Sequence, residues 1–382
     1  MRLSKRYLVG LLVVAIGALV PTQASASSNV TTVAWGLDSP RGIGFLDGRM
    51  VVAEAGHGGK ICLLPSPVCL GGTSRLTWVN PVTHMHSPLV KGLLSVHLGG
   101  PETIGVSGFS VANGKILAII GAGPQLFPPG IGIVNAEAGR LISVEPDGDW
   151  QSVAAVGTRD YNFTLKFKLP TPGVYSPGTQ EHDTNPYGVL ATANGAYVAD
   201  AGSNTLDWVD NSGNITILHH FEWRDPNPNN FPNDTVPTCV APSGGNLWVA
   251  QLSGRLIKLV GGTANLVTPK DAKGMPLLTH VTNCISDRHG NLYFVNMFGP
   301  GIPFTSPSFF VGNVVKYNPV TGHGSVVAGN LSFPNMAAWG PDGNLYVTTG
   351  SICPANGANP FPPPAPNPCV GGGKVVRINL HD

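Results

Sequence analysis

One structural unit recurs six times along the chain, and it constrains the fold more than any other feature. Each unit is a turn rich in Pro or Gly, a short apolar strand, a turn that often reads DG or NG, a second strand, and a third strand after a polar break. The units begin at Ser39, Thr103, Asn185, Val236, Val281 and Phe333. A repeat of this kind indicates an array of equivalent supersecondary units.

The repeat predicts a six-bladed β-propeller. No amphipathic helix separates the units, which argues against a parallel sheet with crossover helices. Propellers usually have roughly four to eight blades. The last unit has only three strands, whereas one further strand, NVTTVAWGL, precedes the first unit. We predict that this N-terminal strand completes the last blade, which closes the ring and removes two exposed edges. Residues 27–382 then form a single all-β domain.

The N-terminal residues 1–26 read as a signal peptide. Lys5 and Arg6 precede the apolar run YLVGLLVVAIGALV, and the small residues ASA lie before Ser27. The apolar run is short for a bilayer span, although an uncleaved anchor is the alternative. We therefore expect a secreted or periplasmic protein with no transmembrane segment after cleavage.

The cysteines support an oxidising compartment, because their number is even. They are Cys62, Cys69, Cys239, Cys284, Cys353 and Cys369. The first pair flanks a short loop and the last pair flanks a Pro-rich loop, so each is expected to form a disulfide. The middle two occupy the same register in neighbouring units, where a disulfide and two buried thiols are both open; the spacings match no common zinc pattern.

The residue that closes the second strand of each unit is usually polar. Alignment of the six units places Glu54, Gly121, Asp200, Gln251, Asn296 and Thr349 at this position. In a hairpin the end of the second strand lies beside the start of the first, and the first strand of a propeller blade lines the channel. We therefore expect a polar ring around one mouth of the channel.

Two interpretations of this ring remain open. The closing side chains can cap strand ends and satisfy backbone groups. Alternatively, carboxylate and amide oxygens of Glu54, Asp200 and Asn296 can form a metal site, for which calcium is the expected ion.

Polar residues expected around this mouth are candidates for binding a ligand. They are Arg41, Glu102, Asp183, Tyr187, Gln251, Asn283 and Asn335. The longest insertion, residues 157–184, contains Asp160 and leads directly into the third unit, so we expect it near the same mouth. The aromatic loop from Phe304 to Phe310 is a candidate surface for a protein partner.

Composition and motifs exclude several function classes. The net charge is +1, which gives no electrostatic case for binding nucleic acid. The sequence has no G-x-S-x-G, no H-E-x-x-H and no phosphate-binding loop. Nothing in the motifs therefore identifies a hydrolase, a metalloprotease or a nucleotide enzyme.

Several segments together resemble the ScyD/ScyE family of secreted bacterial proteins. They are SPRGIGF, VVAEAGHGG, TNPYGV, YVADAGSNTLDWVDNSGNI, VPTCVAPSGGNLWVAQLSG and GKVVRI. This family is similar to six-bladed propellers of the NHL and gluconolactonase types, and its named members belong to the biosynthesis of scytonemin, a cyanobacterial pigment. The resemblance implies an exported propeller that binds or tailors an aromatic small molecule, with Asp200 and Asn204 in the family's ADAG.N segment.

These observations favour an exported propeller that binds a small molecule or a protein ligand at one channel mouth, with calcium as a possible cofactor. The alternative is a calcium-dependent enzyme that acts on a small molecule, either lactonase-like or one that tailors an aromatic metabolite. Gluconolactonase-like enzymes arrange Glu, Asn and Asp around calcium, whereas the order here is Glu54, Asp200, Asn296. We expect a monomer.

Overall fold

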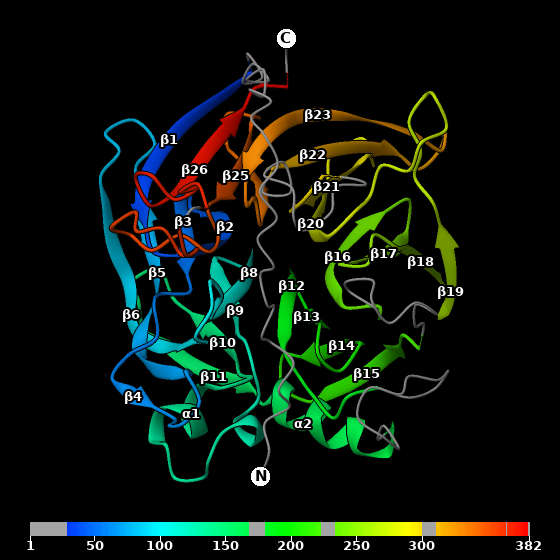
Figure 1. The fold of residues 1–382 in the computed structure, drawn as a ribbon. Coiled ribbons are helices and arrows are strands. Elements are labelled where there is room, and N and C mark those ends of the chain that lie inside the picture. The colour runs from blue at the N-terminus through cyan, green and yellow to red at the C-terminus, as the bar shows by residue number, and fades with distance from the viewer. Residues whose placement is uncertain (1–28, 168–179, 223–233, 300–310, 364, 381–382) are drawn as a thin grey trace.

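The computed structural model of the chain is a six-bladed β-propeller (Figure 1), as the repeat predicted. It describes residues 29–167, 180–222, 234–299, 311–363 and 365–380. The expected signal peptide and the aromatic loop from Phe304 to Phe310 lie outside these ranges.

Each blade is one antiparallel sheet whose strands follow chain order from the channel outward. Blade 1 is β2 (Pro40–Leu46), β3 (Arg49–Glu54), β5 (Cys69–Val79) and β6 (His86–His97), extended by β4 (Ile61–Cys62) and β7 (Thr103–Ile104). Blade 2 is β8 (Val106–Ala112), β9 (Lys115–Ile120), β10 (Leu141–Val144) and β11 (Trp150–Ala154). Blade 3 is β12 (Pro186–Thr192), β13 (Gly195–Asp200), β14 (Thr205–Asp210) and β15 (Ile215–His220).

The remaining blades repeat this order. Blade 4 is β16 (Pro237–Ser243), β17 (Asn246–Gln251), β18 (Leu256–Val260) and β19 (Thr263–Val267). Blade 5 is β20 (Val281–Ser286), β21 (Leu292–Asn296), β22 (Val311–Asn318) and β23 (His323–Ser332). Blade 6 is β24 (Ala337–Trp339), β25 (Leu345–Thr349) and β26 (Gly373–Ile378), completed by β1 (Val30–Leu37).

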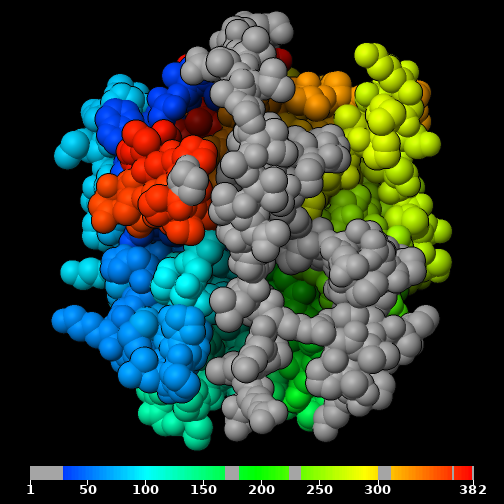
Figure 2. Space-filling view, in the orientation of Figure 1, coloured from blue at the N-terminus to red at the C-terminus, as the bar shows by residue number. Residues whose placement is uncertain are grey.

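Strand β1 closes the ring by pairing with β26, where Val30 lies opposite Ile378 and Leu37 opposite Gly373. The two strands, blue and red in Figure 1, come from opposite ends of the chain. The loop between β25 and β26 lies beside the end of β1: Gly36 N–H donates to the Gly371 carbonyl at 2.8 Å, and Ser39 N–H to the Cys353 carbonyl at 2.8 Å. Figure 2 shows this loop, in orange and red, next to the blue segment. The predicted closure is confirmed.

The core is divided into wedges between blades. Between blades 2 and 3, for example, Ile119 and Leu141 pack with Val198 and Val209. The blades pack face to face, so their middle strands contain apolar runs; VVA in β3 is an example, with Val51, Val52 and Ala53 fully buried. Inner strands of neighbouring blades contact each other all the way around the ring. Gly108 of blade 2 is required there, because a Cβ atom would lie 2.5 Å from the Tyr187 carbonyl oxygen.

Both expected disulfides are present, and the pair that the sequence left open is bridged as well. Cys62–Cys69 closes the β4–β5 hairpin, and Cys353–Cys369 closes the loop between β25 and β26. Cys239–Cys284 joins the inner strands of blades 4 and 5, with a Cα–Cα distance of 5.6 Å. The structure thus selects the disulfide over buried thiols at this third pair. Disulfides of this kind are compatible with an extracellular or periplasmic protein.

Among the described residues, no helix has the length and apolar character needed to cross a bilayer. The α-helices in these ranges are α1 (Gly132–Glu137) and α2 (Val156–Thr164), and both lie in connections at the edges of blades 2 and 3.

Candidate functional site at the channel mouth

The strand register confirms the predicted equivalence of most closing residues. Glu54 lies opposite Pro40, Asp200 opposite Pro186, and Gln251 opposite Pro237. In blade 2 the equivalent pair is Val106 and Ile120, so the alignment that placed Gly121 here was wrong by one residue. The apolar run of that strand continues to its last residue, which is why the glycine of the following turn was mistaken for its end.

Glu54 is fully buried and caps blade 1. Its carboxylate accepts two hydrogen bonds from the Arg75 guanidinium, both at 2.7 Å, one from the Asp38 N–H at 2.6 Å, and one from the Thr77 hydroxyl. The bidentate pairing also raises the pKa of Arg75. The Arg75 guanidinium neutralises the charge of this carboxylate, and together with the Asp38 N–H it satisfies the carboxylate oxygens.

Asp200 caps blade 3 with backbone donors. Its Oδ1 atom accepts N–H bonds from Asn185 at 2.7 Å, Gly202 at 2.9 Å and Ser203 at 3.0 Å. Its Oδ2 atom accepts the Thr184 hydroxyl at 2.5 Å. No basic side chain in the described part of the chain forms an ion pair with Asp200.

Asn296 has the same role in blade 5. Its Oδ1 atom accepts the Thr279 N–H at 3.1 Å, and its Nδ2 atom donates to the Leu277 carbonyl and to Asn313 Oδ1, both at 2.9 Å. The three residues predicted to bind calcium thus lie in alternate blades, and protein groups hold their oxygens. The described residues contain no group of three or more His, Cys, Asp or Glu side chains arranged to hold a metal ion. Their observed role is capping, and calcium at this set stays a prediction.

Four of the candidate ligand-binding residues do come together across the channel. Tyr187 of blade 3 donates its hydroxyl to Asn335 Oδ1 at 2.8 Å, and Asn335 precedes β24 of blade 6, on the opposite side of the ring. Arg41 of blade 1 donates to the Thr103 carbonyl at 2.8 Å and lies 3.7 Å from the Glu102 carboxylate. Burial raises the pKa of Tyr187, while Arg41 and the bond to Asn335 act in the opposite direction. We call Arg41, Glu102, Tyr187 and Asn335 the mouth cluster.

The mouth cluster contains an unsatisfied donor. Asn335 is fully buried, and its Nδ2 atom has no hydrogen-bond partner among the described residues. Its backbone is fixed, because the Thr282 hydroxyl donates to the Asn335 carbonyl at 2.7 Å. The Arg41 side chain is buried, whereas the Glu102 side chain is 54% exposed. The cluster therefore has a buried donor end and a solvated acidic rim.

The other three candidates lie elsewhere. Asn283 Oδ1 accepts the Ala337 N–H at 3.0 Å and so ties blade 5 to blade 6. Asp183 accepts the Thr184 N–H at 2.7 Å beside blade 3, and burial raises its pKa to about 7. Gln251 lines a cavity between blades 3 and 4.

Sequence reasoning placed Asp160 near this mouth but missed Asp207 and the acidic group that both form with Asp200. Asp160 of α2 and Asp207 of β14 are both fully buried and both accept a hydrogen bond from the Thr205 hydroxyl, at 3.2 and 2.9 Å. Burial raises the pKa of Asp160 well above its ordinary value, and repulsion by Asp207 and Asp200 adds to this effect. Burial likewise raises the pKa of Asp207 to about 7. We call Asp160, Asp200 and Asp207 the blade-3 acid group. The sequence signal that could have revealed it is Asp207, a charged residue at a buried position of the third strand of its blade.

Comparisons with known proteins establish the fold and no closer relationship. No family model matches the chain. The curated protein STRICTOSIDINE SYNTHASE-LIKE 3 of Arabidopsis thaliana is 28% identical over 218 residues, which cover 50% of this chain and 51% of that protein. The chain thus spans about half the length of this relative.

Two solved structures extend over nearly the whole chain. A protein of unknown function from Bacteroides thetaiotaomicron has a TM-score of 0.55 at 9% identity, covering 93% of this chain and 77% of that one. A gluconolactonase from Xanthomonas campestris has a TM-score of 0.50 at 10% identity, covering 92% and 89%. Identities this low show a shared propeller fold, and the ScyD/ScyE resemblance stays an expectation.

Proposed function

We propose that this protein is an exported binding propeller whose mouth cluster holds a small carboxylate. The observation that supports the proposal is the Asn335 Nδ2 atom, which is buried without a partner among the described residues. Tyr187 connects it to Arg41, because the Tyr187 hydroxyl interacts with both side chains. A buried donor without an acceptor costs about 1–3 kcal/mol. A ligand oxygen at this position would remove that cost.

The charges of the cluster favour an anionic acceptor. Asn335 offers a donor and Arg41 carries a positive charge that Glu102 meets only at 3.7 Å. Hydrogen bonds between charged partners are roughly twice as strong as neutral ones. The half-exposed Glu102 side chain competes for Arg41, so it sets how strongly an anion is held.

Binding, rather than a reaction, is the function we assign. Export rests on the predicted signal peptide at residues 1–26 together with the three disulfides. Calcium at Glu54, Asp200 and Asn296, and with it calcium-dependent chemistry, remains a separate prediction that metal analysis decides.

The test is a titration of the protein comprising residues 27–382 with benzoate, in which isothermal titration calorimetry measures the binding. We expect saturable binding that Asn335→Leu weakens by about 10-fold or more, since one charge-assisted hydrogen bond is lost. Glu102→Gln should strengthen binding, because it releases Arg41. Gln251→Leu, which removes a buried amide elsewhere, is the matched control and should leave benzoate binding unchanged. Equal affinity in wild type and Asn335→Leu would refute the proposal.

A further inference from the structure

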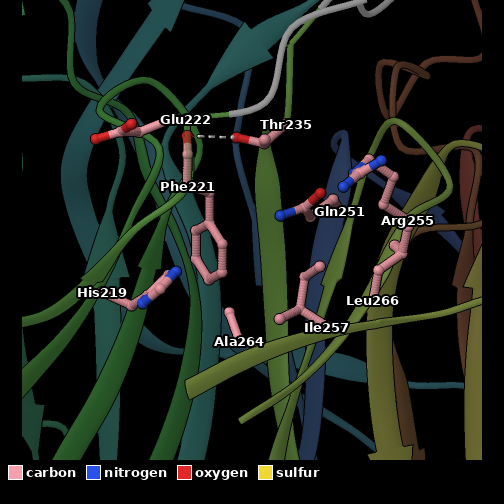
Figure 3. Close-up of a pocket in the computed structure, with 9 residues that line it drawn as sticks. All are labelled: His219, Phe221, Glu222, Thr235, Gln251, Arg255, Ile257, Ala264 and Leu266. Carbon is pink, nitrogen blue, oxygen red and sulfur yellow. Dashed lines mark hydrogen bonds between the residues drawn. The ribbon is translucent and has the colours of Figure 1, made fainter. Parts of the chain in front are cut away.

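A cavity of about 190 Å³ lies between the outer strand of blade 3 and blade 4, away from the mouth cluster. It is lined by His219, Phe221, Glu222, Thr235, Gln251, Arg255, Ile257, Ala264 and Leu266 (Figure 3). One wall therefore comes from β15 and the residues after it, and the other from β17, β18 and β19. Nothing in the function proposed above uses this space.

Gln251 is the unusual residue of the cavity. It is fully buried, and neither its Oε1 nor its Nε2 atom has a hydrogen-bond partner in the part of the chain that the structure describes. Figure 3 shows its amide pointing into the cavity, toward Phe221. Buried amides in proteins are nearly always hydrogen-bonded, so this group calls for a partner.

The position of Gln251 in the blade explains why its amide is left over. The equivalent residues Glu54, Asp200 and Asn296 accept the backbone N–H groups that precede the inner strand of their blade. In blade 4 that role belongs to Asn204, whose Oδ1 atom accepts the Val236 N–H at 3.0 Å and the Thr235 hydroxyl at 2.8 Å. Gln251 is thus released from capping, and its amide is available to something else.

Most of the residues around this amide are aromatic or apolar, and Glu222, Thr235 and Arg255 line the rest of the cavity. The His219 and Phe221 rings contact each other with centroids 4.6 Å apart. Burial lowers the pKa of His219, which favours the neutral imidazole. Ile257 and Phe221 are buried, while Leu266 is half exposed and lies at the open side. These surfaces suit a flat, uncharged ring.

We propose that this cavity binds a small planar aromatic molecule with an amide edge, such as a primary amide or a lactam. The Gln251 Nε2 atom would donate to the carbonyl oxygen of the ligand, while its Oε1 atom would accept the ligand N–H. A carboxylate would leave Oε1 without a partner, because it has no N–H, and its attraction to Arg255 is opposed by Glu222, since both residues line the cavity. The two orphaned atoms thus select an amide over an acid, the reverse of the preference at the mouth cluster.

Benzamide is the probe for this site, and N,N-dimethylbenzamide, which lacks the N–H donor, is its matched control. We expect saturable binding of benzamide to the 27–382 protein by ligand-observed NMR. The dimethyl compound should bind at least about 10-fold more weakly, as expected from the loss of one hydrogen bond to a buried acceptor. This comparison uses the unaltered protein, so it does not depend on any variant folding.

The protein side of the test is Gln251→Leu, with Gln251→Met as a second variant closer in shape. Both should lose benzamide binding by about 10-fold or more while remaining folded, because an unpaired buried amide is replaced by an apolar group. Asn335→Leu should leave benzamide binding unchanged, which separates this cavity from the mouth cluster.

Two results would overturn the proposal. One is benzamide affinity that is the same in wild type, Gln251→Leu and Gln251→Met. The other is the absence of saturable binding up to roughly 10 mM, which would mean that water alone satisfies Gln251.

Discussion

Blades 1 and 3 solve the same capping problem with opposite charge arrangements. Both end their second strand in a buried acid, Glu54 or Asp200. On the neighbouring strand the residue opposite Glu54 is Arg75, whereas the residue opposite Asp200 is Thr205. Two residues further on, Thr77 of blade 1 corresponds to Asp207 of blade 3, since they lie opposite Val52 and Val198.

The difference shows two ways to bury a carboxylate. Blade 1 balances its acid with a cation. Blade 3 adds two more acids, Asp160 and Asp207, and no basic side chain in the described part of the chain forms an ion pair with them. Burying unbalanced charge is costly, so in blade 3 the neutral, protonated form of a carboxyl is favoured instead. The pKa values of Asp160 and Asp207 are accordingly raised, so blade 3 holds the groups of this pair of blades that should respond to pH.

The largest effect is expected from Arg75→Met. This change leaves the Glu54 carboxylate buried without its cation, and we expect the free energy of unfolding to fall by about 3 kcal/mol. Urea denaturation at pH 7 measures it. Arg49→Met is the control in the same blade; the Arg49 guanidinium lies 3.8 Å from the Trp78 ring centroid and is exposed, so its loss should cost under about 1 kcal/mol. If Arg75→Met and Arg49→Met lowered the free energy of unfolding equally, the buried Glu54 carboxylate would not depend on Arg75 more than a surface contact does.

Asp200→Ala should come next. It leaves three backbone N–H groups and the Thr184 hydroxyl without their acceptor, so we expect it to be less stable than Asp200→Asn by about 2 kcal/mol. Elemental analysis of the same samples tests the calcium interpretation. Calcium bound to wild type and lost from a folded Asp200→Ala would favour a metal site, whereas a loss of stability with unchanged metal content would favour the cap.

Stability should also fall with rising pH, and blade 3 should be the cause. The pKa values of Asp160 and Asp207 are raised in the folded protein, so the folded state holds more protons than the unfolded state between about pH 4 and pH 7. Each such proton reduces the free energy of unfolding by up to roughly 1.4 kcal/mol per pH unit in that window.

Asp160→Asn checks this assignment. The variant should flatten the decrease in stability between pH 5 and pH 7, as followed by thermal unfolding at several pH values. A decrease of the same slope in Asp160→Asn and wild type would place the titrating group elsewhere.

The smallest effects should come from removing one hydroxyl in each blade. Thr77→Val removes a donor to Glu54 and should cost about 1 kcal/mol at every pH from 5 to 8. Thr205→Val removes the donor shared by Asp160 and Asp207, so its cost should grow as the pH rises and the carboxyls ionise. A cost for Thr205→Val that is independent of pH would contradict the picture of a titrating blade 3.

Local sequence pattern was sufficient for much of the fold but only for part of the site. The six repeats, the unpaired strand at residues 29–37 and the hairpin geometry predicted the blades, the closure and the capping ends. The same alignment brought Arg41, Tyr187 and Asn335 to the start of inner strands, and the structure places them in contact. The alignment could not distinguish Gln251 from Asn296. Asn296 accepts the backbone N–H before its inner strand, whereas in blade 4 Asn204 accepts that N–H in place of Gln251.

The sequence by itself determined the number of blades, the strand that closes the ring and, outside blade 2, the position of the polar residue at the end of the second strand, since these depend on periodicity and on neighbours within one hairpin. Only the tertiary structure decided what those residues do. Asp160 reaches Asp207 because α2 folds against blade 3, and Asn204 frees Gln251 because the turn of blade 3 meets the start of blade 4. Charge balance and hydrogen-bond satisfaction depend on such contacts between distant segments, which no repeat pattern contains.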